Sequence, residues 1–165
     1  MISQPLKTEH RFSDFVYWVS FALVPLMTAA VAMERLSKAW LVAYLLVLAA
    51  SLALIYRVFC THCPHYMKTG RTVRCMFMWG VPKIFAPRPG PYNPTEKVIV
   101  FAAPALAVLF PLHCLLQSPG LLFVYILSWG VFFTTIRRDE CRRCVHLHCP
   151  VNPAGEDASD SEKAD

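Results

Sequence analysis

Residues 39–63 read AWLVAYLLVLAASLALIYRVFCTHC, an apolar run that ends in an arginine and two cysteines. The first part of this run, Ala39–Tyr56, carries no formal charge, and three more blocks share that property: Phe15–Met33, Val98–Leu116 and Ser118–Ile136. Each block has 18 or 19 residues, and a helix of that length spans roughly 27–28 Å, close to the thickness of a bilayer's hydrocarbon core. The four blocks predict an all-α integral membrane protein, a four-helix bundle with these blocks as its spans.

The composition of the whole chain agrees with a membrane protein. Of its 165 residues, 56% are hydrophobic and only 16% are charged. A soluble domain of this length needs more polar residues to cover its surface. The apolar residues also occur in continuous blocks instead of amphipathic stripes, which argues against a very apolar soluble bundle.

The basic residues that flank the blocks predict the orientation of the chain. Thirteen cations flank the blocks on one side of the membrane, whereas only Arg35 and Lys38 lie on the other. Because cytoplasmic loops carry an excess of Lys and Arg, we expect a multi-pass protein of the inner (plasma) membrane with both termini in the cytoplasm. The formal net charge of +5 does not indicate a nucleic-acid partner, because these cations lie where anionic lipid head groups attract them.

The lengths of the links predict the domain organisation. The links at Glu34–Lys38 and Ser118–Gly120 are short, which predicts two antiparallel hairpins within a transmembrane domain of residues 1–153. Loop 60–97 and segment 137–150 then form a cytoplasmic cysteine-rich cap. Residues 154–165 carry five acidic residues and no aromatic or branched aliphatic residue, so we expect a disordered acidic tail.

Loop 60–97 contains two local signals. Met76–Trp79 is an apolar patch flanked by cations, which suits either a short interfacial helix or a loop packed against the bundle. Asn93-Pro94-Thr95-Glu96 predicts a helix start, since Asn caps, Pro suits the first helical position and Glu reaches back in a capping box. Prolines inside the spans predict kinks at Pro25, Pro104 and Pro111.

The cytoplasmic cysteines carry the strongest chemical signal. Residues 57–63 and 138–144 both read R-x2-C-x2-C, offset by 81 positions. Disulfides are disfavoured in a reducing cytosol, so paired C-x2-C motifs there indicate metal binding or redox chemistry. Two cysteines three residues apart can turn both sulfurs toward one ion, and two such pairs complete a tetrahedral shell. We therefore predict a metal site held by Cys60, Cys63, Cys141 and Cys144.

The number of sites and the metal are open at this point. Possible additional ligands are Cys75, Cys149, His62, His65, His146 and His148. Six thiolates exceed one tetrahedral site, so they indicate either substitute ligands or two sites completed by histidine. An iron–sulfur cluster is favoured because Cys63-Pro64 and Cys149-Pro150 share the Cys-Pro ending of a ferredoxin motif. Zinc is the alternative, and so is thiol redox chemistry or handling of a soft ion such as Cu(I).

Two short segments carry a family resemblance. Arg57-Val58-Phe59-Cys60 with Cys63-Pro64, and Cys149-Pro150-Val151-Asn152, resemble the Cys-Pro motifs of membrane-bound polyferredoxin-like proteins of the quinol pathways to nitrate and nitrous-oxide reductases. The resemblance implies cytoplasmic cysteine motifs that carry electrons or support assembly of a metal centre. The chain departs from that family, which favours C-x3-C-P, because it has C-x2-C-P and C-x4-C-P and no appended ferredoxin domain.

The remaining polar residues limit the function further. No span contains Asp, Glu, Lys or Arg, which argues against a proton-coupled transporter or an ion channel. No nucleophile–base pair or phosphate-binding glycine loop is present, so a stand-alone enzyme is not expected. Whether His113 or Cys114 has a role stays open. We expect electron transfer, or a subunit of a membrane redox complex, with a redox partner protein and quinone as candidate partners. The alternative is a structural zinc-binding assembly protein.

Overall fold

The structure is a computed structural model that describes residues 7, 10–146, 149 and 151–152. Within these residues the chain is mostly helical. Four helical segments are long and apolar enough to cross a membrane: Phe12–Leu36, Lys38–His62, Pro94–Leu115 and Pro119–Arg143. The predicted helical class, with four segments long and apolar enough to span a membrane, is therefore confirmed. The predicted acidic tail, residues 154–165, lies outside the described residues.

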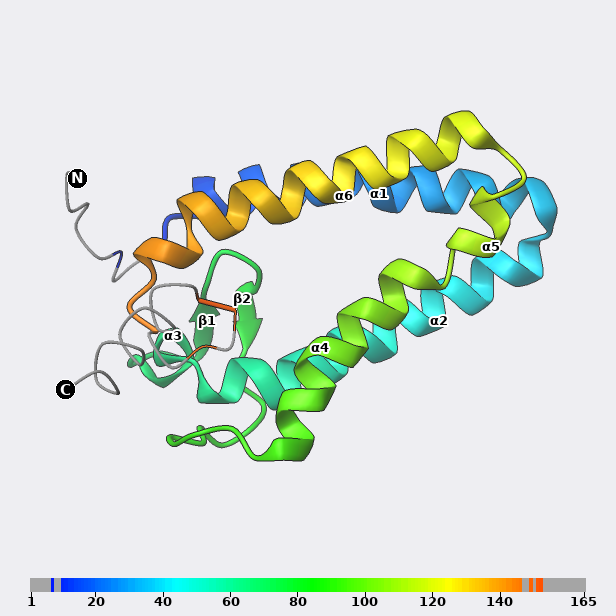
Figure 1. The fold of residues 1–165 in the computed structure, drawn as a ribbon. Coiled ribbons are helices and arrows are strands. Elements are labelled where there is room, and N and C mark those ends of the chain that lie inside the picture. Colours follow the sequence, from blue (N-terminus) through cyan, green and yellow to red (C-terminus); the bar gives the residue numbers. More distant parts are fainter. Residues whose placement is uncertain (1–6, 8–9, 147–148, 150, 153–165) are drawn as a thin grey trace, which may run out of the picture.

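Two small strands interrupt an otherwise helical order (Figure 1). The elements are α1 (Phe12–Leu36), α2 (Lys38–Leu54), α3 (Pro64–Met67), β1 (Thr72–Arg74), β2 (Trp79–Pro82), α4 (Pro94–Leu109), α5 (Leu112–Leu115) and α6 (Pro119–Asp139). Helices α2 and α6 are each followed by turns that are not α-helical. α2 continues through a π-helical turn, Ile55–Phe59, into a 3₁₀ turn, Cys60–His62, and α6 is followed by a 3₁₀ turn, Cys141–Arg143.

Local sequence explains where the long helices begin. Ser37 separates α1 from α2, because its N–H donates to the Met33 carbonyl at 3.0 Å and its hydroxyl accepts from the Ala39 N–H at 3.2 Å. Helix α4 begins at Pro94, and the N–H of Asn93 donates to the Glu96 carboxylate at 3.0 Å. The predicted start of this helix is therefore confirmed.

Proline breaks the third span. Pro111 has no N–H to donate, and its ring clashes with the preceding turn of a helix. Helix α4 accordingly ends at Leu109 and α5 begins at Leu112. The predicted kink is therefore a two-residue break in the α-helix, although Phe110 and Pro111 keep helical backbone angles. Pro25 and Pro104, in contrast, lie inside α1 and α4, which continue past them.

The long helices pack as two pairs. Helix α1 packs along α6, and α2 packs along α4. The pairs meet where α1 turns into α2 and where α5 lies, and they diverge toward the other end (Figure 1). That other end carries residues 60–92, 141–146, 149 and 151–152, and we call it the cysteine-rich end.

A shared core joins the two pairs at the α5 end. Its fully buried members include Met33 of α1, Tyr44 of α2, Leu115 of α5 and Tyr125 of α6. The Tyr125 hydroxyl donates to the Val108 carbonyl of α4 at 2.7 Å, which ties α6 to α4. Toward the cysteine-rich end each pair has its own small core. Trp18 packs with Phe132 and Ile136 in one pair, whereas Val58 packs with Val100 in the other.

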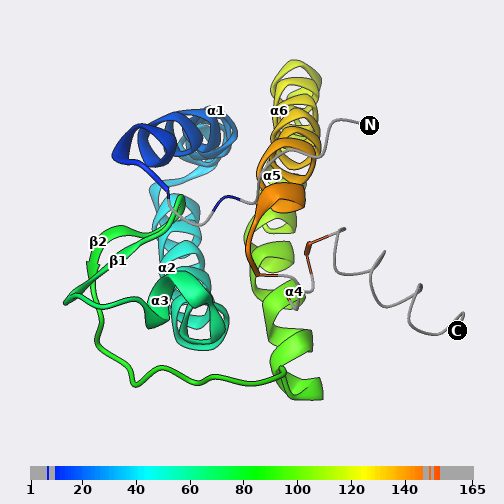
Figure 2. The same cartoon turned by 90° about the vertical axis from the view of Figure 1, so that its left-hand side faces the viewer.

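A short β-hairpin lies between the pairs at the cysteine-rich end (Figures 1 and 2). Strands β1 and β2 are antiparallel, and Arg74 lies opposite Trp79. Residues 75–78 form the connection of this hairpin and Trp79 begins β2, so the predicted interfacial helix over Met76–Trp79 is wrong. The other reading, a loop packed on the bundle, is correct, because Met76 packs against the Trp18–Phe132 core. The β-branched Thr72 and Val73 favour strand over helix at this point.

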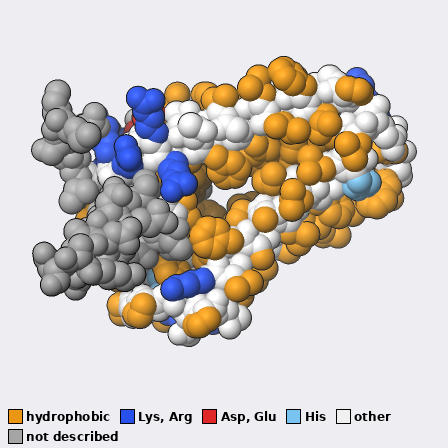
Figure 3. Space-filling view, in the orientation of Figure 1, with side chains coloured by type: hydrophobic (Ala, Val, Ile, Leu, Met, Phe, Trp, Pro, Cys, Tyr) orange, Lys and Arg blue, Asp and Glu red, His pale blue; other side chains and the backbone are white. Residues whose placement is uncertain are grey.

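The outer faces of the helices are apolar (Figure 3). Large side chains such as Leu46, Leu116 and Phe123 are two-thirds exposed. A water-soluble protein rarely exposes continuous apolar surface of this kind. These faces are suited to contact with lipid, as the sequence predicts.

Candidate metal centre

The two C-x2-C motifs have the same backbone structure. Each motif is a 3₁₀ turn that follows a long helix. The Cys63 N–H donates to the Cys60 carbonyl at 3.0 Å, and the Cys144 N–H donates to the Cys141 carbonyl at 3.1 Å. The second cysteine of each motif is extended, with φ/ψ of −77°/135° at Cys63 and −74°/136° at Cys144. We call these two turns knuckle 1, residues 60–63, and knuckle 2, residues 141–144.

The structure brings all six predicted cysteines to one end of the molecule. Cys63 lies near enough to Cys60, Cys75 and Cys144 for their charges to raise its pKa. Cys75, which follows β1, packs with Cys63 around Cys60 and Tyr66. Cys149 is in turn close to Cys144 and Cys75. Cys75 therefore lies between the two knuckles, which its position in the sequence does not indicate.

Burial controls the chemistry of these thiols. Desolvation is the largest cause that raises the pKa of Cys63, Cys75 and Cys144, and it raises the pKa of Cys149 to about 11. The thiolate is the form that binds metal. A metal ion must therefore displace protons from these sulfurs, at a cost that falls as the pH rises.

Backbone amides lower the pKa of these cysteines and so oppose the effect of burial. In three segments the amide stands two residues after the cysteine. The N–H of the residue two places further on interacts with the sulfur and lowers its pKa: His65 with Cys63, His146 with Cys144, and Val151 with Cys149. Cys75 has amides of this kind from Met76, Phe77 and Met78. Amide donors to sulfur stabilise a bound thiolate and tune the metal that it holds.

The predicted histidines differ in their positions. His65 reaches from beyond knuckle 1 toward knuckle 2, with Nε2 4.0 Å from the Cys144 sulfur. His62 is engaged elsewhere: its Nδ1 is 2.8 Å from the Val58 carbonyl and its Nε2 is 3.6 Å from Glu96. His146 lies beside Tyr92, with ring centres 6.3 Å apart. His148 lies outside the described residues.

An N-terminal strap, which we define as Lys7 and residues 10–14, contacts knuckle 2 and, through His65, the segment that follows knuckle 1. It is not apparent in the sequence. The Lys7 N–H donates to the Arg143 carbonyl of knuckle 2, and Lys7 Nζ lies 3.0 Å from Glu140 and from Asp14. The buried ring of His10 lies 4.8 Å from that of His65. The contacts of Lys7 with Arg143 and Glu140 link residues more than 130 positions apart, and His10 and His65 are 55 positions apart. No local pattern could therefore have revealed them.

A second missed group surrounds knuckle 1. Arg88 Nη1 lies 2.8 Å from Glu96, whose other oxygen faces His62. The ring of Tyr92 lies 4.6 Å from that of His62. The pairing of Glu96 with Arg88 and His62 anchors the first turn of α4 to knuckle 1. Glu96 was expected only as part of the helix cap.

His113 and Cys114 lie at the opposite end of the molecule from the knuckles. The Cys114 sulfur is 3.0 Å from His113 Nε2, and the His113 ring is 4.6 Å from that of Trp40. Cys114 is buried in the shared core. It is therefore a suitable control for substitutions of the six clustered cysteines.

The donor set suits a soft metal, but its side chains do not converge in the described structure. Among residues 7, 10–146, 149 and 151–152, no three His, Cys, Asp or Glu side chains meet closely enough to hold a metal ion. The four-sulfur shell of Cys60, Cys63, Cys141 and Cys144 therefore stays a prediction. Comparisons with protein-family models, curated proteins and solved structures find no match to this chain.

Proposed function

We propose that this chain is an inner-membrane protein that binds a metal centre, most favourably an iron–sulfur cluster, and transfers electrons alone or within a membrane redox complex. Both termini and the cysteine-rich end face the cytoplasm in this proposal. The observation that carries it is the pair of knuckles, which share one backbone conformation at the same end of the molecule. Matched turns of this kind suit ligands for a shared cofactor.

The chain supplies a suitable ligand environment. Cys63, Cys75 and Cys144 come from three separate segments and neighbour one another. Rotation of a cysteine side chain changes the position of its sulfur while the backbone stays in place. When bound, an iron–sulfur cluster would supply one-electron chemistry at a potential set by hydrogen bonds and solvent exposure. The residues of this chain would contribute the thiolates, the amide donors and the exclusion of water.

A structural zinc site is the second candidate. It is favoured by the small size of the elements at the cysteine-rich end, where α3 has four residues and β1 three. Elements this short gain little stability from their own hydrogen bonds. Metal binding can supply the missing folding free energy.

Thiol redox catalysis fits the structure less well. A catalytic thiol needs a lowered pKa and access to its substrate. Burial instead raises the pKa of Cys63, Cys75, Cys144 and Cys149. Such thiols are poor nucleophiles at neutral pH until a metal or another cation replaces the proton.

Metal analysis of anaerobically purified protein tests the proposal. We expect iron and acid-labile sulfide, visible absorption that bleaches with dithionite, and an EPR signal in the reduced state. Cys144→Ser should remove the iron, whereas Cys114→Ser, at the opposite end, should keep it. Stoichiometric zinc without colour would favour the structural candidate. Absence of any bound metal would refute both.

A further inference from the structure

A histidine follows each knuckle at the same spacing. Residues 60–65 and 141–146 both read C-x2-C-x-H, so the two histidines occupy equivalent positions. Their surroundings nevertheless differ. His65 Nε2 lies 4.0 Å from the Cys144 sulfur of knuckle 2, whereas the second histidine lies beside Tyr92. His65 therefore reaches from the segment after knuckle 1 to the opposite knuckle, and its contact with Cys144 joins the two helix pairs.

The separation of the His65 and Cys144 atoms suits a shared metal ion. A tetrahedral ion about 2.3 Å from a sulfur and about 2.0–2.1 Å from an imidazole nitrogen holds those two atoms about 3.6 Å apart. The observed distance is 4.0 Å, so a small rotation of either side chain brings both atoms onto one ion. The pair is thus arranged as two adjacent corners of a tetrahedral shell.

Two further thiols lie beside this pair. Cys63 is close enough to Cys75 and Cys144 for their charges to act on it, and Cys75 packs with Cys63 in the same small core. The neighbours whose charges act most strongly on Cys141 belong instead to its own segment. Together with His65, the three sulfurs of Cys63, Cys75 and Cys144 make four ligands, which is the number a tetrahedral shell needs.

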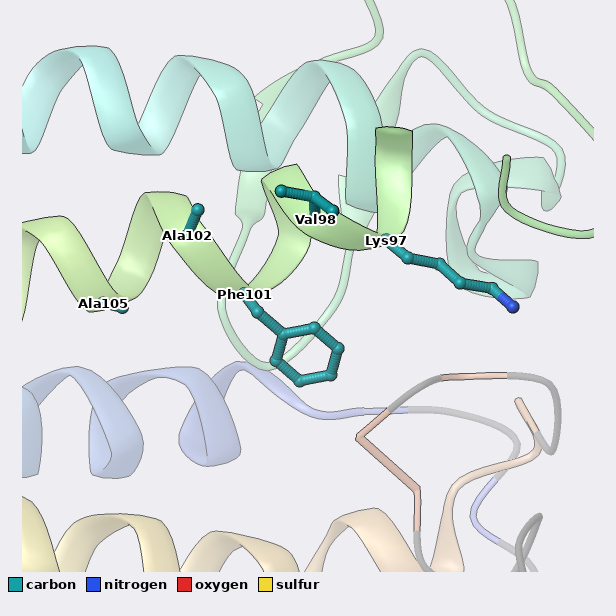
Figure 4. A pocket seen from close by; sticks show the side chains of 5 residues that line it. All are labelled: Lys97, Val98, Phe101, Ala102 and Ala105. Atoms are coloured by element: carbon teal, nitrogen blue, oxygen red, sulfur yellow. The ribbon is translucent and has the colours of Figure 1, made fainter. Parts of the chain in front are cut away.

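Other side chains at this end are less suited to complete the shell. His62 is turned toward Glu96, with Nε2 3.6 Å from the carboxylate. Figure 4 shows one face of α4, which presents Lys97, Val98, Phe101, Ala102 and Ala105. None of these five side chains is a ligand for a soft metal. His65 is therefore the best placed of the described histidines.

The N-terminal strap fixes the His65 ring. The buried ring of His10 lies 4.8 Å from it, tilted by 57°. His10 is held in turn by two carboxylates, because Asp14 and Glu140 each have an oxygen 3.8 Å from its Nδ1. His65 itself is only 2% exposed. Packing of this kind orients a ligating imidazole before the metal binds.

We propose that the metal centre has a mixed shell of three thiolates and one imidazole. Its ligands are Cys63, Cys75, Cys144 and His65. This assignment rests on the metal binding proposed above and names the residues that perform it. The three thiols lose their protons on binding, whereas the imidazole binds in its neutral form, so the shell carries one negative charge fewer than four thiolates. In an iron–sulfur cluster, histidine in place of cysteine raises the reduction potential.

Cobalt binding to the whole chain tests this shell, whichever metal the native protein holds. The chain is purified in detergent, stripped of metal, reduced and loaded with Co²⁺. Pulsed EPR of protein labelled with ¹⁵N-histidine should show one strongly coupled nitrogen, and the thiolate-to-cobalt absorption should match three sulfurs. His65→Cys should still bind Co²⁺, lose the nitrogen coupling and gain the absorption of a fourth sulfur. His65→Ala should weaken Co²⁺ binding by more than the roughly 10–100-fold that loss of an outer-shell partner costs.

Two histidine variants serve as controls. His113→Ala, at the opposite end, and His146→Ala, at the equivalent position after knuckle 2, should both keep the nitrogen coupling. Four coordinating sulfurs without nitrogen in the wild type would overturn the mixed shell and leave the proposed metal binding intact. So would a nitrogen coupling that persists in His65→Ala. Failure of the wild type to bind Co²⁺ would refute both.

Discussion

At the scale of single residues, the protonation of the clustered thiols depends on two opposing effects. Removal from water disfavours the thiolate, whereas amide donors favour it. At Cys149 the first effect is larger and raises the pKa to about 11, even though the Val151 and Asn152 amides lower it. A thiol with a pKa this high stays protonated and reacts slowly at neutral pH until it binds a metal. That behaviour suits a ligand and not a nucleophile.

The reactivity of Cys149 in metal-stripped protein follows from this pKa. The usual value is 9.0, so a rise of about two units lowers the thiolate fraction at neutral pH about hundredfold. Iodoacetamide should therefore modify Cys149 about a hundred times more slowly in folded protein than in urea at pH 7.5, as followed by peptide mass spectrometry. The difference should shrink above pH 10, when both forms ionise. Equal rates at pH 7.5 would show that Cys149 is not buried as described.

At the scale of helices and strands, the sequence predicts the spans well and their neighbours poorly. Uncharged blocks such as Ala39–Tyr56 identify a span by length alone. They do not identify the packing face, because a helix that is apolar all round looks the same toward lipid and toward protein. The pairing of α1 with α6 could therefore not be predicted. The hairpin that places Cys75 between the knuckles was also missed, because Met76–Trp79 is apolar enough to resemble an interfacial helix.

The N-terminal strap should respond to pH through His10. Burial, followed by the charge of Lys7, lowers the pKa of this imidazole, although Glu140 and Asp14 oppose the shift. A lowered pKa in the folded state means that the stabilising contribution is present above the unfolded value of 6.5 and is lost as the pH falls below it. Wild-type protein should therefore lose thermal stability between pH 7 and pH 5 relative to His10→Phe, in which this position cannot titrate. Parallel pH profiles of the two proteins would rule out a role for His10.

At the scale of the whole molecule, the shared core and the proposed metal centre lie at opposite ends. The α5 end holds the shared core of the long helices, whereas toward the cysteine-rich end each helix pair has its own small core. Knuckle 1 follows a helix of the α2–α4 pair and knuckle 2 follows a helix of the α1–α6 pair. The two pairs share a core at the α5 end, far from the knuckles. A metal bound by cysteines of both helix pairs would hold the pairs together at the cysteine-rich end. The proposed centre would therefore stabilise the fold whichever metal it contains.

The shared core should be sensitive to loss of volume. Met33 is fully buried there, whereas Met27 on the same helix is 59% exposed to the lipid side. Met33→Ala should destabilise the protein by about 2 kcal/mol, because a packed cavity is left behind. Met27→Ala should have little effect, since lipid fills the space. Thermal unfolding in detergent measures both, and equal losses would contradict the position of the core.

Whether the two knuckles hold one centre or two can be decided by combining substitutions. Cys63 follows α2 and Cys144 follows α6, so the two cysteines come from different helix pairs. They neighbour each other, and Cys75 is close to both. We therefore expect one shared centre, in which Cys63→Ser and Cys144→Ser each remove nearly all bound metal and the double variant loses no more. Two separate centres would instead leave about half of the metal in each single variant and none in the double. Losses of residues in one shared site are not additive, so metal content per chain across wild type, both single variants, the double variant and Cys114→Ser decides between the two arrangements.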